Sequence, residues 1–563
     1  MLVLIFAFTA CASQTNCGDE EHCPDDSYGS HEPNDPYEPS PPIVSGRTLA
    51  QIRQSLETEF YVVATAANNG YQMLTAKRDL SWVVVIQFSN NSLASLAEDY
   101  WKNNILQLKP NAIPELIEFE RDGRNLIFTH NRVWFQTTLP VLRIGMAMEE
   151  IDRNVRDWTT ASITGIECQD FAEIFEFANV AVEVRGRGQS SWRMSVGNAP
   201  YAGKRPFRMR FPSGQPRSIL DSGFAAREWT FIANQSDKSL MRNYSAYYLG
   251  RLLDGMPFAP NAQLIHVYMN GVYQGIYQMS DQNNQPQPGR VDIITNNNPQ
   301  ISEFLFEMCR HEIFRWRNPD HYTSHPDYPR PHIILNENAQ RERPFQIEAG
   351  GRAEGHADFY LTVAYAQTFL QNVDDALRSQ NFNQIARWID IPSFIDYYLV
   401  QELYKNIDVN TSSARFTIRG QGESRRLYAG PVWDFDIAAG NAYYQPGLGG
   451  YSPQGEWVTY RCDWFRDLLA VPSIRTQIRT RWTQIKNREV RQALDRLDFM
   501  ADTYAYCFDR NFGRWQIMNI YVWPNPSNVW NHNSDFNIRT HRGQVDFLID
   551  WLEQRGNWMS SWF

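Results

Sequence analysis

Cysteine and basic residues are both scarce in this sequence. Its 563 residues include 7 cysteines, and none of them stands at a spacing typical of a metal site. Lysine and arginine together number 53 against 63 aspartates and glutamates, which gives a formal net charge of −10. This charge argues against nucleic acid as a general partner and favours a basic protein or peptide as a substrate.

The apolar segment at the N-terminus is short. Residues 1–11 are apolar but too few to span a bilayer, and no lysine or arginine precedes them, which is atypical of a signal peptide. Thr9 and Ala10 before Cys11 resemble a bacterial lipoprotein cleavage site, at which Cys11 would carry the lipid. We therefore expect an exported lipoprotein, attached through Cys11 to the outer membrane or the cell surface. The alternative is an apolar segment that stays on the chain.

Composition divides the chain into three regions. Residues 1–45 join the N-terminal segment to a stretch rich in Asp, Glu, Pro, Ser and Gly, which predicts a disordered stalk. Residues 46–137 predict a small α+β accessory region, with a strand at 82–88 and a helix at 93–106. Residues 138–563 would form the main domain, and a hydrophobic content of 43% is ample for its core.

Two other segments of the main domain have a clear pattern. Residues 283–350 predict a loop-rich insertion with four histidines, whose spacings fit no common metal site. Residues 545–552 predict an amphipathic helix that packs on the core. Cys17 and Cys23 could pair in an exported stalk, and the main-domain cysteines are either buried thiols or one or two disulfides.

A pair of aspartates follows an apolar run in the main domain. Residues 427–429 are apolar, and Asp434 and Asp436 come shortly after them. At the end of a strand, residues two apart point to the same face, and two such carboxylates repel each other unless a cation or a proton lies between them. The pair therefore indicates a site for magnesium or calcium, which prefer oxygen ligands. A turn in which each aspartate caps a backbone amide is the alternative.

A further aspartate follows a predicted helix. Apolar residues recur at helical spacing along 394–404, and Asn406, Asp408 and Asn410 come next. A helix end that carries an aspartate and amide partners suits a catalytic acid or base. A helix stop stabilised by Asx turns is the alternative, and this segment taken alone favours it.

Glycines lie between two predicted strands. The alternating residues 180–185 lead into Gly186 and Gly188, and a second strand at 207–211 follows Lys204. Glycines let backbone amides approach an anion, and basic side chains neutralise it, so this arrangement is typical of a phosphate-binding loop. A glycine pair is also typical of a hairpin turn.

These segments, taken with two more, resemble the CotH-type protein kinases, a family named for a spore-coat protein. The resemblance begins near residue 139, extends to the C-terminus, and consists of motifs in one fixed order. They are Arg-Gly-x-Gly-x-Ser-Ser-Trp from Arg185, Asn-x-x-Asp-Lys-Ser-x-x-Arg-Asn from Asn234, Asn-Gly-x-Tyr-x-Gly-x-Tyr from Asn270, Gln-Glu-Leu-x-x-Asn-x-Asp from Gln401, and Val-Trp-Asp-Phe-Asp from Val432.

The resemblance implies an α+β fold similar to an atypical protein kinase, with a small N-terminal α+β extension. Such a protein would bind ATP and magnesium, manganese or calcium, and would transfer phosphate to Ser or Thr of a protein. By correspondence with the motifs, Asp408 would be the catalytic aspartate and Asp434 the metal ligand. Asp436 and Asn410 would be further metal or positioning residues.

The nucleotide-binding residues are implied in the same way. Lys204 would contact the phosphates, and Gly186 and Gly188 would cover the nucleotide. Asp281 stands where the family has a glutamate, so pairing with the lysine would require Asp281 to reach further. Gln189 stands where the family has an asparagine.

Two other classes of function compete with the kinase. A surface adhesin or scaffold would suit an exported protein, because ATP is scarce outside the cytoplasm. A glycoside hydrolase would need two carboxyl groups about 5 to 9.5 Å apart, which Asp434 could form with Asp436 or Asp408. The ordered motifs argue against the hydrolase. The presence of Asp408 and Asp434 favours an active kinase over an adhesin, whereas the lipoprotein-like Cys11 favours the adhesin.

Overall fold

Strands fill the first half of the described chain and helices much of the second, which confirms the α+β class. The structure is a computed structural model that describes residues 60–66, 71–76, 83–100, 116–130, 139–151, 157–167, 177, 179–188, 191–192, 203–220, 222–223, 225–282, 290–291, 298–308, 332–336, 342–350, 359–410, 412–443, 452–457, 459, 462–529 and 538–563. All of them belong to the unit Pro42–Phe563. Within these ranges, no helix has the length and apolar character needed to cross a membrane.

Several predictions fall outside the described residues. The stalk, with Cys11, Cys17 and Cys23, is one of them, and Gln189, Cys168, Cys309 and three of the four histidines are others. The two described cysteines of the main domain, Cys462 and Cys507, are buried free thiols.

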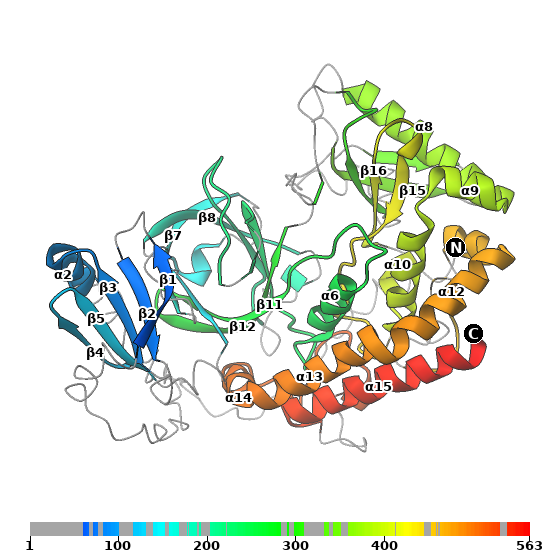
Figure 1. Cartoon of the computed structure of the whole chain (residues 1–563). Helices are drawn as coiled ribbons and strands as arrows, with labels where there is room; N and C mark the ends of the chain where they lie inside the picture. The colour runs from blue at the N-terminus through cyan, green and yellow to red at the C-terminus, as the bar shows by residue number, and fades with distance from the viewer. Residues whose placement is uncertain are drawn as a thin grey trace, which may run out of the picture. The chain divides into compact units, whose positions relative to one another are not determined.

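The first sheet is made entirely of residues from the accessory region. Its strands are antiparallel and lie in the order β1-β2-β3-β5-β4. They are β1 (Phe60–Ala66), β2 (Tyr71–Ala76), β3 (Val83–Phe88), β4 (Leu116–Asp122) and β5 (Asn125–His130), with helix α2 (Asn91–Tyr100) after β3 (Figure 1). The strand predicted at 82–88 is confirmed as β3, and the helix predicted from residue 93 is found as α2.

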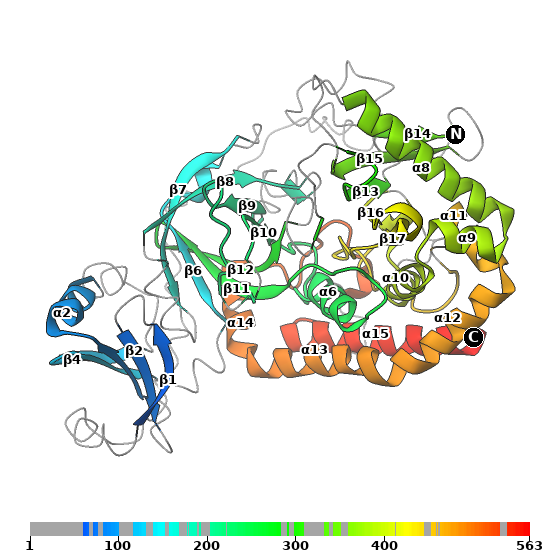
Figure 2. The ribbon, with the colours of Figure 1, turned by 45° about the horizontal axis from the view of Figure 1, so that its top comes forward.

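The second sheet closes into a barrel, in the order β10-β12-β11-β6-β7-β8-β9 (Figure 2). Its strands are β6 (Val141–Ile144), β7 (Thr159–Glu167), β8 (Val180–Gly186), β9 (Phe207–Arg210), β10 (Glu228–Ile232), β11 (Gln263–Met269) and β12 (Val272–Asp281). β8 and β9 confirm the two strands predicted beside the glycines. Because side chains alternate along a strand, Val182 and Val184 of β8 are both buried in the barrel core. In the pairing of β8 with β9, Arg185 lies opposite Arg208.

The third sheet has the order β14-β15-β13-β16-β17. Its strands are β13 (Phe304–Met308), β14 (His332–Leu335), β15 (Arg343–Ala349), β16 (Ala414–Arg419) and β17 (Arg426–Ala429). Three of these strands lie within residues 283–350, so the segment predicted to be rich in loops contains regular structure, and much of the rest of it lies outside the described residues. Phe304, Phe306 and Met308 alternate and are fully buried, but a run of this length among polar and proline-rich segments is too short to reveal a strand.

The helices of the main domain are α6 (Arg242–Leu252), α8 (Phe359–Ser379), α9 (Phe382–Trp388), α10 (Ile391–Leu403), α11 (Asp463–Ala470), α12 (Pro472–Ile485), α13 (Arg491–Thr503), α14 (Ala505–Arg514) and α15 (His541–Trp562). A π-helical turn at Lys486–Val490 joins α12 to α13. Short 3-10 turns occupy Met148–Glu150, Ile407–Asn410, Gly422–Ser424 and Ser527–Val529. The helices predicted at 394–404 and 545–552 are confirmed as α10 and α15.

Helix α10 is buried along almost its whole length. Asp390 caps its first turn by accepting from Ser393 N at 2.9 Å, and helices α6, α12 and α15 pack around it. Near its C-terminal end, Glu402 forms a fully buried ion pair of 2.8 Å with Arg555 of α15. In both views α13 runs beside α15 (Figures 1 and 2). The residues that follow α10 are therefore held by packing on several sides.

Candidate active site

Asp434 lies in a turn rather than at a strand end. β17 ends at Ala429, and Asp434 has a φ of +65°. Its backbone NH donates to Tyr247 Oη at 3.4 Å, and its carbonyl accepts from Asn406 Nδ2 at 3.2 Å. The prediction that strand pleating aligns Asp434 with Asp436 is wrong, because the chain leaves the extended conformation before it reaches them.

Asn406 joins the two acidic motifs. Its side-chain oxygen accepts from Asp408 N at 3.1 Å, while its amide group donates to Asp434 O. The first bond is the Asx turn expected of a helix stop, so the turn interpretation of this segment is correct in its geometry. The second bond brings the Asp408 turn beside Asp434. The contact of Asn406 with Asp434 was not predicted from the sequence. The Asx turn was, because an asparagine two residues before an aspartate at a helix end is typical of one.

The predicted acidic residues gather in one cluster. Asp408, Asp434 and Asp436 are each half-buried. Burial raises the pKa of Asp436 well above its ordinary value, and the charges of Asp434, Asp408 and Asp237 raise it further. Asp237 belongs to the Asn234 motif but was not predicted as a site residue. The charges of three other carboxylates therefore act on Asp436.

Arg187 is the basic residue of the glycine loop that acts on this cluster. Burial lowers the pKa of its guanidinium, and the charges of Asp434 and Asp436 raise it. The guanidinium lies 5.9 Å from the centre of the Trp433 ring. Arg187 was not predicted as a site residue, although it stands between the two predicted glycines.

The two glycines make room for side chains of their own loop. A Cβ on Gly186 would come within 2.9 Å of the Trp192 ring, and one on Gly188, where φ is +80°, within 2.1 Å of Ser191 Oγ. The backbone NH of Arg187 donates to Pro206 O at 3.2 Å. Both glycines therefore leave room for side chains that lie close to them, and the charges of Asp434 and Asp436 act on Arg187.

Lys204 is buried, and its Nζ donates to Ile276 O at 2.6 Å and to Asn511 Oδ1 at 3.2 Å. Burial lowers the pKa of Lys204 to about 7, and the charge of Asp237 acts in the opposite direction. Asp281 pairs instead with Arg290, whose Nε donates to it at 2.7 Å. Asp281 therefore does not form the ion pair with Lys204 that was considered for it from its position in the family motif. Ile276 and Asp281 are five residues apart on β12, which is about 16 Å along a strand.

A second group of residues surrounds Asp434 from the third sheet. Ser413 Oγ donates to Asp434 Oδ2 at 3.1 Å, and Glu307 Oε1 of β13 accepts from Ser413 N at 3.1 Å. Burial raises the pKa of Glu307 to about 7, which the nearby charge of Arg415 opposes. Glu307 was missed because the sequence placed it in a loop.

The carboxylates are of the chemical type that would suit a divalent cation bound together with a nucleotide. Asp434 and Asp436 offer oxygen ligands, and a cation would relieve the repulsion that raises the pKa of Asp436. Magnesium in such sites is usually held by one or two carboxylates, with water and phosphate oxygens completing its shell. Among the described residues, no three His, Cys, Asp or Glu side chains are arranged as a metal centre. The side chain of Asn410, the third predicted ligand, lies outside the described part of the chain.

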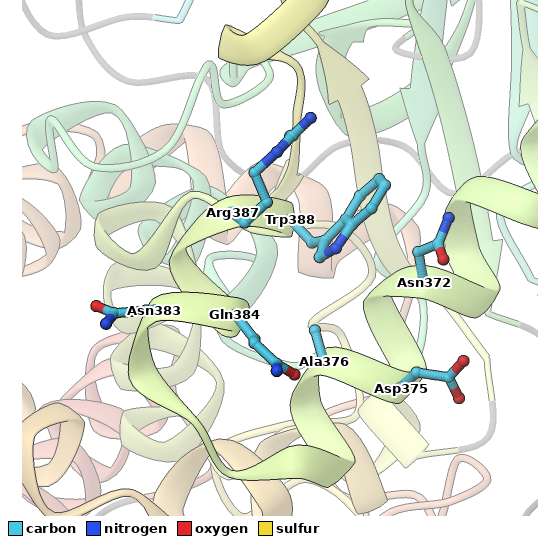
Figure 3. Close-up of a pocket in the computed structure, with 7 residues that line it drawn as sticks. All are labelled: Asn372, Asp375, Ala376, Asn383, Gln384, Arg387 and Trp388. Atoms are coloured by element: carbon cyan, nitrogen blue, oxygen red, sulfur yellow. The ribbon is translucent and has the colours of Figure 1, made fainter.

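A cavity of about 420 Å³ lies elsewhere, between α8 and α9. Figure 3 shows Trp388 and Gln384 of α9 pointing toward α8, which contributes Asn372 and Asp375. None of its seven lining residues was predicted for the site or contacts the acidic cluster in any hydrogen bond described above. This cavity therefore does not carry the proposed chemistry.

Comparison with known protein families matches the family described as CotH kinase protein over residues 184–559. A search of curated proteins finds no match. The matched range includes the glycine loop, Asp237, Asn406 and the three aspartates of the predicted site, and it covers most of the chain. The chain therefore belongs to the CotH kinase family.

Proposed function

We propose that this protein is an atypical Ser/Thr kinase that transfers the γ-phosphate of ATP to a hydroxyl group of a protein. The observation that carries this proposal is that the side chain of Asn406 binds the backbone of both Asp408 and Asp434, which come from two separate motifs, and that the charges of these two aspartates act on Asp436. Phosphoryl transfer needs positioned charges more than covalent help from the protein. A cluster of this kind meets that need.

Each charged residue would have a distinct role. Asp434 and Asp436 would hold a divalent metal, which would neutralise the charge of the transferred phosphoryl group when bound. Asp408 would accept the proton of the substrate hydroxyl group. Arg187, on which the charges of Asp434 and Asp436 act, would contact the phosphates from the glycine loop.

The substrate and location of the protein belong to the same proposal. A basic, Ser-rich protein segment would be attracted by the acidic cluster and by the net charge of −10. The sequence around Cys11 supports export and a lipid anchor at the outer membrane or cell surface. The oxygen-rich site suits magnesium, and manganese would replace it in an assay.

Phosphate incorporation from labelled ATP tests the proposal. The assay uses magnesium or manganese, with the protein itself and a basic Ser-rich peptide as acceptors. Asp408→Asn and Asp434→Asn should each lower incorporation by about 10²-fold or more. Asp254→Asn is the matched control, because its side chain is 90% exposed and pairs with Arg481 at the surface. Equal incorporation by the wild type and both site variants would contradict the proposal.

A catalytically weak or inactive surface scaffold is the second candidate. The observation that favours it is Lys204, whose Nζ is engaged by Ile276 O and Asn511 instead of a carboxylate. Binding of nucleotide by the wild type without phosphate transfer to any acceptor would support an inactive kinase fold. Failure to bind nucleotide as well would support an adhesin or scaffold.

A further inference from the structure

A chain of contacts starts at Asp434, passes through the third sheet, and ends at Trp433, the residue that precedes Asp434. Ser413 Oγ donates to Asp434 Oδ2 at 3.1 Å, and Ser413 N donates to Glu307 Oε1 at 3.1 Å. Arg415 Nη2 donates to Glu307 Oε2 at 3.2 Å. The Arg415 guanidinium lies 4.8 Å from the centre of the Trp433 ring. We call these residues the positioning ring: Asp434, Ser413, Glu307, Arg415 and Trp433.

The ring holds two residues in a conformation that L-amino acids rarely adopt. Asp434 has a φ of +65° and Ser413 a φ of +62°. Glycine would accept the backbone of residue 413 at lower cost, but it has no hydroxyl group to donate. Strain of this kind persists where the surrounding structure over-determines it, and it often marks a functional position. The hydroxyl group of Ser413 is thus kept despite an unfavourable backbone.

Ser413, Arg415 and Trp433 of the ring are buried, and Glu307 and Asp434 are partly buried. Ser413 is 7% exposed, and the Arg415 and Glu307 side chains are 5% and 17% exposed. Because water competes poorly at such positions, a hydrogen bond to a carboxylate there fixes the orientation of that carboxylate. The ring also leaves Oδ1 of Asp434 free of the Ser413 bond.

We propose that Ser413, held by Glu307, is a positioning residue that fixes the Asp434 carboxylate in the orientation in which it binds the divalent metal. This inference rests on the proposed function. Glu307 of the third sheet would therefore contribute to metal binding, although it lies outside the acidic motifs. Ser413 acts only through Asp434, since it reaches the site by a single hydrogen bond to that residue.

Manganese binding to the full chain, measured by electron paramagnetic resonance with a non-hydrolysable ATP analogue, tests the inference without depending on phosphate transfer. Ser413→Gly removes the hydroxyl group but relieves the backbone, so the protein should fold as before. We expect its manganese affinity to fall about tenfold. Glu307→Gln keeps an oxygen for Ser413 N but removes the charge that faces Arg415, and should give a smaller loss.

Thr417→Val is the matched control. Thr417 lies on the same strand as Arg415, is fully buried, and its hydroxyl group has no hydrogen-bond partner among the described residues. Its replacement should leave manganese affinity unchanged. An equal loss in Thr417→Val and Ser413→Gly would overturn the inference.

Two further results separate this inference from the proposed function. Manganese affinity that is equal in the wild type and in Ser413→Gly would overturn the role of Ser413 and leave the kinase proposal standing. A folded wild type that binds no manganese with the nucleotide analogue would overturn both.

Discussion

Replacing Arg242 with methionine should strongly destabilise the protein. The Arg242 and Asp237 side chains are both fully buried and form an ion pair of 2.5 Å. The guanidinium also donates to the carbonyls of Ala438 and Ala439, each at 3.2 Å. Methionine would leave a buried carboxylate without its counter-charge and two carbonyls without these donors. Removing one partner of such a pair costs about 3 to 5 kcal/mol.

The assay is urea unfolding, followed by fluorescence, with Arg491→Met as the control. Arg491 also pairs with two acids, Asp495 at 2.6 Å and Glu553 at 2.9 Å, but its side chain is 53% exposed. Exposed pairs of this kind contribute about 0.2 to 1 kcal/mol. If Arg242→Met lowered the free energy of unfolding no more than Arg491→Met, the assignment of a structural role to the buried pair would be wrong.

Three other predictions concern the residues around the site. Asn406→Ala removes two hydrogen bonds, so it should lower the free energy of unfolding by about 1 to 3 kcal/mol. It should also lower phosphate incorporation at least tenfold. Full activity in a folded variant would contradict the role of Asn406 in joining the Asp408 and Asp434 motifs. Asp281→Asn and Arg290→Met break the same ion pair, so a double-mutant cycle on the free energy of unfolding should give a coupling of about 0.5 to 3 kcal/mol. In a second cycle, the effects of Asp281→Asn and Lys204→Met on the free energy of unfolding should be additive. Coupling in the second cycle instead would restore the pairing of Asp281 with Lys204. Burial lowers the pKa of Lys204 to about 7, so between about pH 7 and its ordinary pKa of about 10.4 the unfolded chain binds more protons than the folded protein. The free energy of unfolding should therefore rise with pH across this window more steeply in the wild type than in Lys204→Met, and parallel pH profiles would contradict the shift.

Local patterns in the sequence were sufficient to predict several elements. Alternation located β8 and β9, and helical periodicity located α10 and α15, because the spacing of apolar residues within each of these segments is enough to indicate its type of element. Asp408 and Asp434 could be singled out in the same way, since polar residues interrupt apolar runs at both places. The cluster they form depends on Asn406, and that contact joins positions 28 residues apart.

Contacts between distant segments were beyond the reach of local patterns. Glu307 meets Ser413 across 106 positions, and Lys204 meets Asn511 across 307. Such pairs are set by how the sheets and helices pack, and no periodicity within either segment records them. A pairing of Asp281 with Lys204 could be considered only from a family position, whereas the fold places Arg290 within reach of Asp281.

The most direct test of the acidic site is anomalous diffraction from crystals of the protein grown with manganese and a non-hydrolysable ATP analogue. We predict a manganese peak within ligand distance of the Asp434 and Asp436 carboxylates, with the terminal phosphate of the analogue between that peak and Asp408. A manganese peak bound at another place, with Asp434 and Asp436 still free of metal and nucleotide, would contradict the proposed site.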